Sequence, residues 1–148
     1  MDILTGRPVT LAPHSMVTSP HSLASQAGAD VLRAGGSAVD AALATAAVLA
    51  VVYPHMTGLG GDAFWLIHEG RSGEIKYLNG GGKAAVGASL AALGERGIGE
   101  IPLRGIVPAT LTVPGAVASW MAAHDNYGRL PLSRVLDSAM RYARDGYP

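Results

Sequence analysis

A glycine cluster, TGLGGDA over residues 57–63, is the first feature that could do chemistry, because backbone N–H groups in glycine-rich loops can bind phosphate. Gly58, Gly60 and Ala63 fit the loose dinucleotide-binding pattern, in which the last glycine can be alanine. That pattern requires a strand before it, a helix after it and an acidic residue about 20 positions on. Here an alanine-rich run precedes the cluster and a β-rich run follows it. We therefore interpret the cluster as a turn whose glycines take positive φ or let a strand pass close to other backbone.

Three side chains could act as acids or bases, and each has a structural explanation. His55 suits loop packing, Asp62 can accept backbone N–H bonds within the glycine turn, and Asp40 occupies the third position of a helix capping box. The chain has no cysteine, and its histidines do not follow H-x-x-x-H or HExxH spacing. We expect neither a metal site nor a cofactor.

Charge and hydropathy argue against two classes of partner. Lys plus Arg and Asp plus Glu each total 11, so the net charge is zero and no basic surface indicates nucleic acid. The most apolar run, residues 38–53, contains Asp40 and stops at Pro54, short of the roughly 20 residues that a membrane-spanning helix needs. The first residues lack an apolar segment behind a basic start, so we expect no secretory signal and a cytoplasmic location.

The elements that must position these residues can be read from helix and strand signals. Ser19 followed by Pro20 predicts a helix start, and apolar residues continue at helical spacing to the glycines at 35 and 36. Ser37 and Asp40 predict a capping box for a second helix over 38–52. This second helix is apolar on nearly every face, so it must be covered all round, and we expect the 148 residues to leave its cover incomplete.

A strand pair and three more helices complete the predicted order. The β-rich runs 62–68 and 74–79 are joined by five residues that include Gly70 and Gly73, which predicts an antiparallel hairpin. Further helices are predicted over 90–96, 116–127 and 132–144, and glycines at 128 and 146 end the last two. The fold class is therefore mixed, α/β or α+β, with helices and one antiparallel strand pair.

Taken in order, these motifs resemble the gamma-glutamyltranspeptidase family. GGSAVDAA (35–42) is similar to the family's GG.AVDAA helix start, and GLGGDAF (58–64) to its G.GG..F strand. VPG (113–115), YGRLP (127–131) and ARDGY (143–147) resemble the family's next landmarks. The resemblance spans residues 15–148, and we treat residues 1–14 as an N-terminal extension.

The resemblance implies the N-terminal portion of an αββα-sandwich N-terminal-nucleophile hydrolase. Such an enzyme is made as a precursor that cleaves itself to free a threonine. The threonine hydroxyl attacks a γ-glutamyl amide such as glutathione, its own α-amino group serves as base, and the acyl-enzyme passes to water or an amino acid. In this family the nucleophile opens a later, small subunit.

No threonine of this chain matches the family's autocleavage motif, so we name no catalytic residue. The resemblance implies that 15–148 is a partial domain, truncated at its C-terminus. We expect it to be inactive alone and to have the rest of the same precursor, the small subunit, as its partner. The other partner would be a small γ-glutamyl or acyl amide substrate.

One segment departs from the family's Asp-x-Arg-Glu-x-Ala-Pro pattern, whose arginine holds the substrate's α-carboxylate. Aligned on Ala84, Gly81 stands at the arginine position and Gly82 at the glutamate position. A family branch with an NGSGRAP-like segment is more similar, and Lys83 stands where that branch has arginine. We predict Lys83 as a substrate-binding residue. Two alternatives stay open: an acylase-like amidase with a non-glutamyl substrate, and an inactive binding or structural fragment.

Overall fold

The computed structural model describes residues 9–101 and 111–148. Residues 1–8, which belong to the predicted N-terminal extension, lie outside the described residues. The elements, in chain order, are α1 (Ser22–Arg33), α2 (Ala38–Val52), β1 (Ala63–His68), β2 (Ile75–Gly80), α3 (Leu90–Glu95), α4 (Ala116–Tyr127), α5 (Leu132–Val135) and α6 (Asp137–Asp145). The predicted order of helices around one antiparallel hairpin is confirmed.

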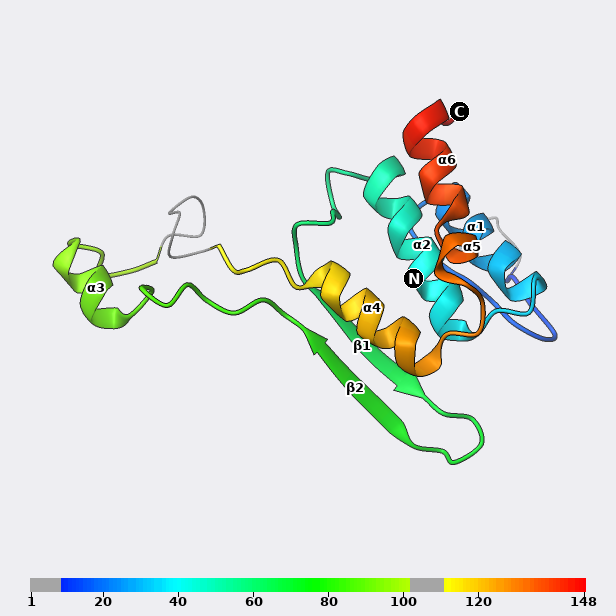
Figure 1. Cartoon of the computed structure of the whole chain (residues 1–148), viewed down its shortest axis with the longest axis horizontal. Helices are drawn as coiled ribbons and strands as arrows, with labels where there is room; N and C mark the ends of the chain where they lie inside the picture. Colours follow the sequence, from blue (N-terminus) through cyan, green and yellow to red (C-terminus); the bar gives the residue numbers. More distant parts are fainter. Residues whose placement is uncertain (1–8, 102–110) are drawn as a thin grey trace, which may run out of the picture.

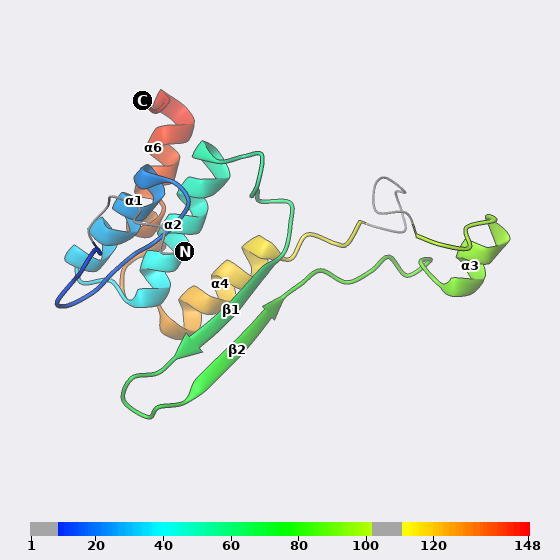
Figure 2. The same cartoon turned by 180° about the vertical axis from the view of Figure 1, so that it is seen from behind.

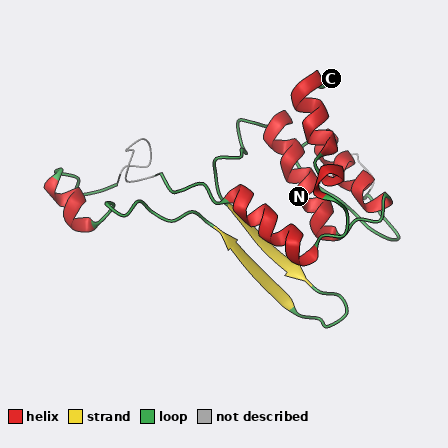
Figure 3. Ribbon diagram, viewed as in Figure 1, coloured by secondary structure: helices red, strands yellow, loops and turns green. Residues whose placement is uncertain are grey.

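The elements form two groups that meet at α4 (Figure 1). Helices α1, α2, α5 and α6 lie together on one side, while β1 and β2 form a hairpin on the other, and α4 contacts both α2 and the hairpin. The same arrangement seen from behind shows α3 standing apart, beyond the extended stretch that follows β2 (Figure 2). Within the described residues the hairpin is the one sheet of the fold (Figure 3).

Helix α2 is the centre of the apolar core. Leu43 and Val48 are fully buried, and α1, α4, α5 and α6 all pack against this helix. Its small alanine side chains let these neighbours approach closely, which is how a helix that is apolar all round can be covered. The prediction that this helix would lack complete cover is confirmed in part, because Ala50 and Val51 are only half-buried and line an open apolar hollow of about 330 Å³.

A further uncovered apolar surface lies on the hairpin. Side chains alternate between two faces, and Trp65 on the inner face donates from its indole N–H to the Ser119 hydroxyl of α4 at 3.1 Å. On the other face, four large side chains are between 63% and 76% exposed: Phe64, Leu66, Ile75 and Tyr77. We call this set the outer face of the hairpin.

The start of α1 differs from the prediction. Ser19 was expected to cap the helix, but α1 begins at Ser22, and the Nδ1 of His21 accepts the Leu23 N–H at 3.3 Å. Ser19 instead bonds the His21 carbonyl at 2.9 Å and the Ser25 hydroxyl at 2.8 Å. The Ser19 hydroxyl still accepts the His21 N–H, at 3.4 Å, and the His21 ring satisfies a different amide, that of Leu23, where the helix begins.

The last predicted helix, 132–144, is interrupted at Leu136. Its N–H donates to the Leu132 carbonyl and ends α5, while its own carbonyl accepts the Met140 N–H and opens α6. Gly146 ends α6 with a positive φ of 84°, a conformation that favours glycine. The predicted end of this segment is confirmed within one residue.

Candidate functional site

Three segments that are distant in the sequence meet where the hairpin joins α4. They are the end of the glycine turn (61–62), the end of β2 with the residues after it (80–83), and the turn before α4 (113–115), and we call them together the glycine junction. The Gly61 carbonyl accepts the N–H groups of Gly115 and Ala116 at 3.1 and 2.9 Å. The Val113 N–H donates to the Lys83 carbonyl at 2.9 Å. These bonds fix the start of α4 against both strands.

Asp62 connects two of these segments through its side chain. Its Oδ1 accepts the Gly82 N–H at 2.8 Å and lies 3.5 Å from the Thr112 hydroxyl, which donates to it. We expected Asp62 to close the glycine turn itself, and this was wrong, because the amide it binds comes 20 residues later. A carboxylate that accepts hydrogen bonds from two separate segments of the chain holds those segments in a fixed position relative to each other.

The glycines of the turn have no steric role in the described residues. Gly58, Gly60 and Gly61 do not have positive φ, and a Cβ on any of them would meet nothing within 4 Å. The close approach of backbone occurs across the junction, at Gly80, Gly82 and Gly115. Glycine does let backbone pass close to other backbone here, as predicted, but the prediction placed this close approach at the wrong glycines.

At each of these three positions a Cβ would overlap existing atoms. The one on Gly80 would overlap the Ser119 side chain, and the one on Gly115 would overlap the Gly80 carbonyl oxygen. On Gly82 it would overlap the Val113 carbonyl oxygen, which cannot move without moving the turn before α4. Backbone therefore packs directly on backbone here, as only glycine allows.

Lys83 lies in this junction with an exposed side chain. The residue before it, Gly82, donates its N–H to Asp62, and Gly81 donates its N–H to the Asn79 side-chain oxygen at 2.8 Å. The two glycines at the family's arginine and glutamate positions therefore have their amides already bonded within the chain. Lys83 is the positive charge that the junction itself carries.

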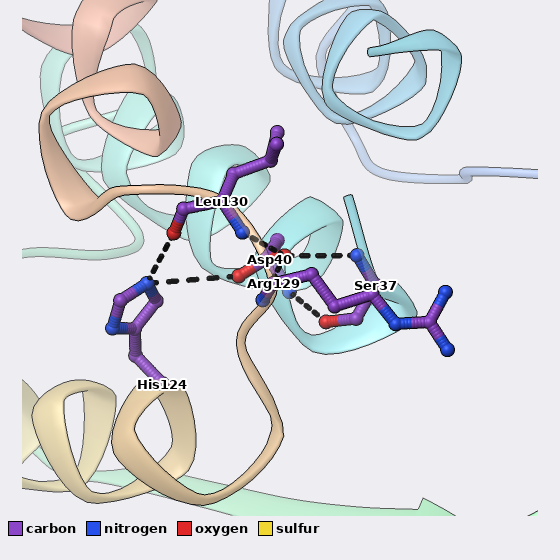
Figure 4. A network of polar contacts seen from close by, with 5 residues as sticks. All are labelled: Ser37, Asp40, His124, Arg129 and Leu130. Atoms are coloured by element: carbon purple, nitrogen blue, oxygen red, sulfur yellow. Dashed lines mark hydrogen bonds and ion pairs between the residues drawn. The ribbon is translucent and has the colours of Figure 1, made fainter. Parts of the chain in front are cut away.

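A second polar cluster lies at the opposite end of α4 (Figure 4). Asp40 is fully buried, and its Oδ2 accepts the N–H groups of Ser37 and Arg129 at 2.8 Å each and of Leu130 at 3.2 Å. The Ser37 hydroxyl accepts the Asp40 N–H at 3.0 Å, so the predicted capping box is confirmed. Through these hydrogen bonds the same carboxylate also connects the turn after α4 to the start of α2.

His124 completes this cluster. Its Nε2 lies 2.9 Å from the Leu130 carbonyl oxygen and 3.7 Å from Asp40 Oδ1, which has no hydrogen-bond partner among the described residues. Because a carbonyl only accepts, Nε2 carries the proton and points toward both oxygens. Sequence reasoning did not find this contact, because residues 84 positions apart share no local pattern.

The environment of Asp40 lowers its pKa. Burial alone raises the pKa of a carboxyl group, but the backbone N–H groups of Ser37, Arg129 and Leu130 and the contact with the Ser37 side chain stabilise the charged form and outweigh it. Asp40 is therefore a charged, structural carboxylate, and the prediction of a capping role is confirmed and extended.

His55 has a local packing role. It is exposed, and its ring centroid lies 4.3 Å from that of Tyr53 at an interplanar angle of 59°. In the described parts of the chain, no group of three or more histidine and acidic side chains is placed to hold a metal ion. None of the described helices combines the length and apolar character that crossing a membrane requires.

Comparisons with known proteins agree with these motifs. The family model for gamma-glutamyltranspeptidase matches residues 24–148. The chain is 53% identical over 133 residues to the glutathione hydrolase-like YwrD proenzyme of Bacillus subtilis, which covers 90% of this chain and 25% of that protein. It is 45% identical over 143 residues to the oxamate amidohydrolase proenzyme of Klebsiella pneumoniae, covering 93% and 26%. The chain thus spans about a quarter of the length of these curated relatives.

Solved structures give the same result for the fold. The crystal structure of Helicobacter pylori gamma-glutamyltranspeptidase superposes with a TM-score of 0.82 at 34% identity, covering 95% of this chain and 40% of that chain. Cephalosporin acylase from Bacillus halodurans superposes with a TM-score of 0.75 at 38% identity, covering 95% and 28%. The predicted N-terminal-nucleophile hydrolase type of α/β fold is confirmed. The chain belongs to the gamma-glutamyltranspeptidase family.

Proposed function

We propose that these residues are the N-terminal part of a self-cleaving precursor that hydrolyses γ-glutamyl amides, glutathione among them, or transfers their acyl group. Its nucleophile would be a threonine freed by the cleavage, in a part of the protein outside these 148 residues. The observation that carries the proposal is the family match over residues 24–148, which includes all three segments of the glycine junction. The proenzyme names of the two curated relatives support a precursor.

In this proposal the described residues act as scaffold and as one wall of the substrate site. A threonine hydroxyl is a weak nucleophile until an adjacent base takes its proton, and the α-amino group of the same residue can do so. The tetrahedral intermediate then needs fixed hydrogen-bond donors in a rigid site. The bonds across the glycine junction supply such rigidity, because they leave Gly61, Gly82 and Val113 no freedom to shift independently.

Lys83 is the substrate-binding residue of the proposal. We expect Lys83→Ala in the full-length protein to raise KM for an acidic amide substrate about tenfold with little change in kcat, because it removes a charge-assisted contact with the substrate carboxylate. Steady-state kinetics with γ-glutamyl-p-nitroanilide would measure both parameters.

The matched control is Arg71→Ala, which removes an exposed positive charge from the hairpin loop and should leave KM unchanged. Lys83→Arg should retain most of the affinity, because it retains the charge. An unchanged KM in Lys83→Ala would exclude contact between this side chain and the substrate.

A second candidate substrate class is a small acyl amide without an α-amino acid group. It is favoured by Gly81 and Gly82, whose N–H groups already donate to Asn79 and Asp62 and are not free to bind a substrate carboxylate. The oxamate amidohydrolase and the cephalosporin acylase among the similar proteins carry amidase and acylase names. For such a substrate, Lys83 would contribute one charge contact at most.

The test is to express the protein from its complete natural gene and to determine its intact mass. We expect two fragments, the smaller beginning with threonine, and release of p-nitroaniline from γ-glutamyl-p-nitroanilide. Two fragments with activity only on oxamate or simple acyl amides would support the second candidate. A single unprocessed mass without activity on either class would contradict both and support an inactive fragment.

A further inference from the structure

A run of three glycines, residues 80–82, leads directly into Lys83. Glycine lacks a Cβ, and its backbone is less restricted than that of any other residue. The ammonium group of a lysine stands at the end of a flexible four-carbon chain. It can therefore meet one particular group of a substrate only if the backbone that carries it is fixed, and the glycine run by itself does not fix it.

Two side chains hold the last two glycines of this run. The Gly81 N–H donates to the Asn79 side-chain oxygen at 2.8 Å, but Asn79 is only two residues away and belongs to the same stretch of chain. The Gly82 N–H donates at 2.8 Å to Asp62 Oδ1, which comes from the residue before β1. Asp62 therefore connects the end of the glycine run to the facing strand, immediately before Lys83.

The backbone of Lys83 is also held on its other side. Its carbonyl accepts the Val113 N–H at 2.9 Å, and Ala84 and Thr112 form an antiparallel bridge beside this bond. The stretch after β2 and the stretch before α4 accordingly leave the hairpin side by side (Figures 1 and 2). The Thr112 hydroxyl donates to Asp62 Oδ1 at 3.5 Å, a longer and weaker contact than the one from Gly82. One carboxylate thus contacts both stretches.

A side chain at position 82 could not fix this stretch in place of Asp62. A Cβ on Gly82 would overlap the Val113 carbonyl oxygen, so the Gly82 N–H has to be held by a side chain from a neighbouring segment. A carboxylate suits this position, because its hydrogen bonds are stronger than those of a neutral acceptor. We propose that Asp62 is the positioning residue for Lys83, which means that its carboxylate fixes the backbone from which the ammonium group reaches an acidic substrate. The inference rests on the proposed function, in which Lys83 binds the substrate carboxylate.

Steady-state kinetics of the full-length protein with γ-glutamyl-p-nitroanilide test the effect on binding. We expect Asp62→Ala to raise KM about fivefold with little change in kcat, and Asp62→Asn to retain most of the affinity, because its amide oxygen can still accept the Gly82 N–H. In the Lys83→Ala background, Asp62→Ala should change KM by less than about twofold, because the side chain that it positions is already absent. A further rise of about fivefold in that background would overturn the proposal.

Glu74→Ala is the matched control for the loss of a carboxylate. Glu74 is exposed and lies next to the start of β2, at the loop end of the same hairpin and away from the glycine junction. Its removal should leave KM unchanged. Equal rises in KM from Asp62→Ala and Glu74→Ala would contradict the proposal, because the loss of any negative charge from the hairpin would then have the same effect.

Amide hydrogen exchange on the same variants gives a measurement that needs no substrate. We expect Asp62→Ala to accelerate exchange of the Gly82 N–H at least about tenfold, while the Glu69 N–H, which donates to the Glu74 carbonyl at the loop end, exchanges as in wild type. Unchanged exchange at Gly82 would overturn the proposal. Faster exchange at Gly82 with an unchanged KM in Lys83→Ala would support the hold of Asp62 on this backbone and exclude the substrate contact of the proposed function. The two failures are therefore distinguishable.

Discussion

Replacing Asp40 by alanine in the full-length protein is expected to lower the free energy of unfolding by about 3 to 5 kcal/mol. The substitution leaves three backbone N–H groups, those of Ser37, Arg129 and Leu130, without their shared acceptor at a fully buried position. It also releases the end of α4 from the start of α2. Urea unfolding followed by circular dichroism measures the change.

Two variants separate the contributions to this loss. Ser37→Ala removes only the hydroxyl that accepts the Asp40 N–H, and it should lower the free energy of unfolding by about 1 kcal/mol. Asp40→Asn keeps one oxygen acceptor but places an amide N–H₂ toward the His124 Nε2 proton, so its cost should fall between the other two. An Asp40→Ala variant no less stable than Ser37→Ala would show that the bonds to Arg129 and Leu130 contribute little.

The Asp40 carboxylate also makes stability depend on pH. Its pKa in the folded protein lies below the ordinary value of about 4, so its stabilisation is fully present above pH 4 and is lost as the pH falls through the lower folded value. The difference in unfolding free energy between wild type and Asp40→Asn should therefore stay constant above about pH 5 and shrink as the pH falls from about 4 through the lower folded value. A difference that stays constant as the pH falls below about 4 would contradict a depressed pKa.

Gly82→Ala should be at least as damaging, with a loss of at least about 3 kcal/mol or failure to accumulate as soluble protein. Its Cβ would overlap the carbonyl of Val113, and that carbonyl belongs to backbone held in place by the bond from the Val113 N–H to Lys83. In Gly115→Ala the added Cβ would overlap the Gly80 carbonyl oxygen in the same way. Thermal unfolding of the full-length variants measures both.

The control is Gly60→Ala in the adjacent turn. Gly60 has no positive φ, and a Cβ there meets nothing within 4 Å, so the variant should stay within about 1 kcal/mol of wild type. If Gly60→Ala were the more damaging change, the assignment of the steric requirement to the junction would be wrong. One melting experiment on the three variants and the wild type gives all of these comparisons.

The difference between these glycines shows what the sequence could predict. The hairpin, the capping box of α2 and the order of the helices follow from signals within a few residues of each other, and all are confirmed. The glycines at positions 58, 60 and 61 and those at positions 80–82 look alike in the sequence. Only the passage of Val113 beside Gly82 decides where a side chain is excluded, and that contact joins residues 31 positions apart.

The same difference between local signals and long-range contacts applies to the candidate site. Asp62 and Asp40 could be identified as acceptors of backbone N–H groups, but not their partners Gly82, Arg129 and Leu130, because long-range partners depend on packing. The expected start of α1 was wrong for a local reason, since the His21 ring caps the helix by accepting the Leu23 N–H. The role of Lys83 stays a prediction that the kinetics above address.

The bridge between Ala84 and Thr112 has a consequence for how this family can vary. The chain departs from the hairpin and returns to it at adjacent points, so this bridge forms a neck that closes the connection between them. For a flexible connection, doubling its length costs only about 0.6 kcal/mol of closure entropy. Insertions and deletions in related chains can therefore accumulate inside this span, while the backbone on both sides of the neck keeps one geometry.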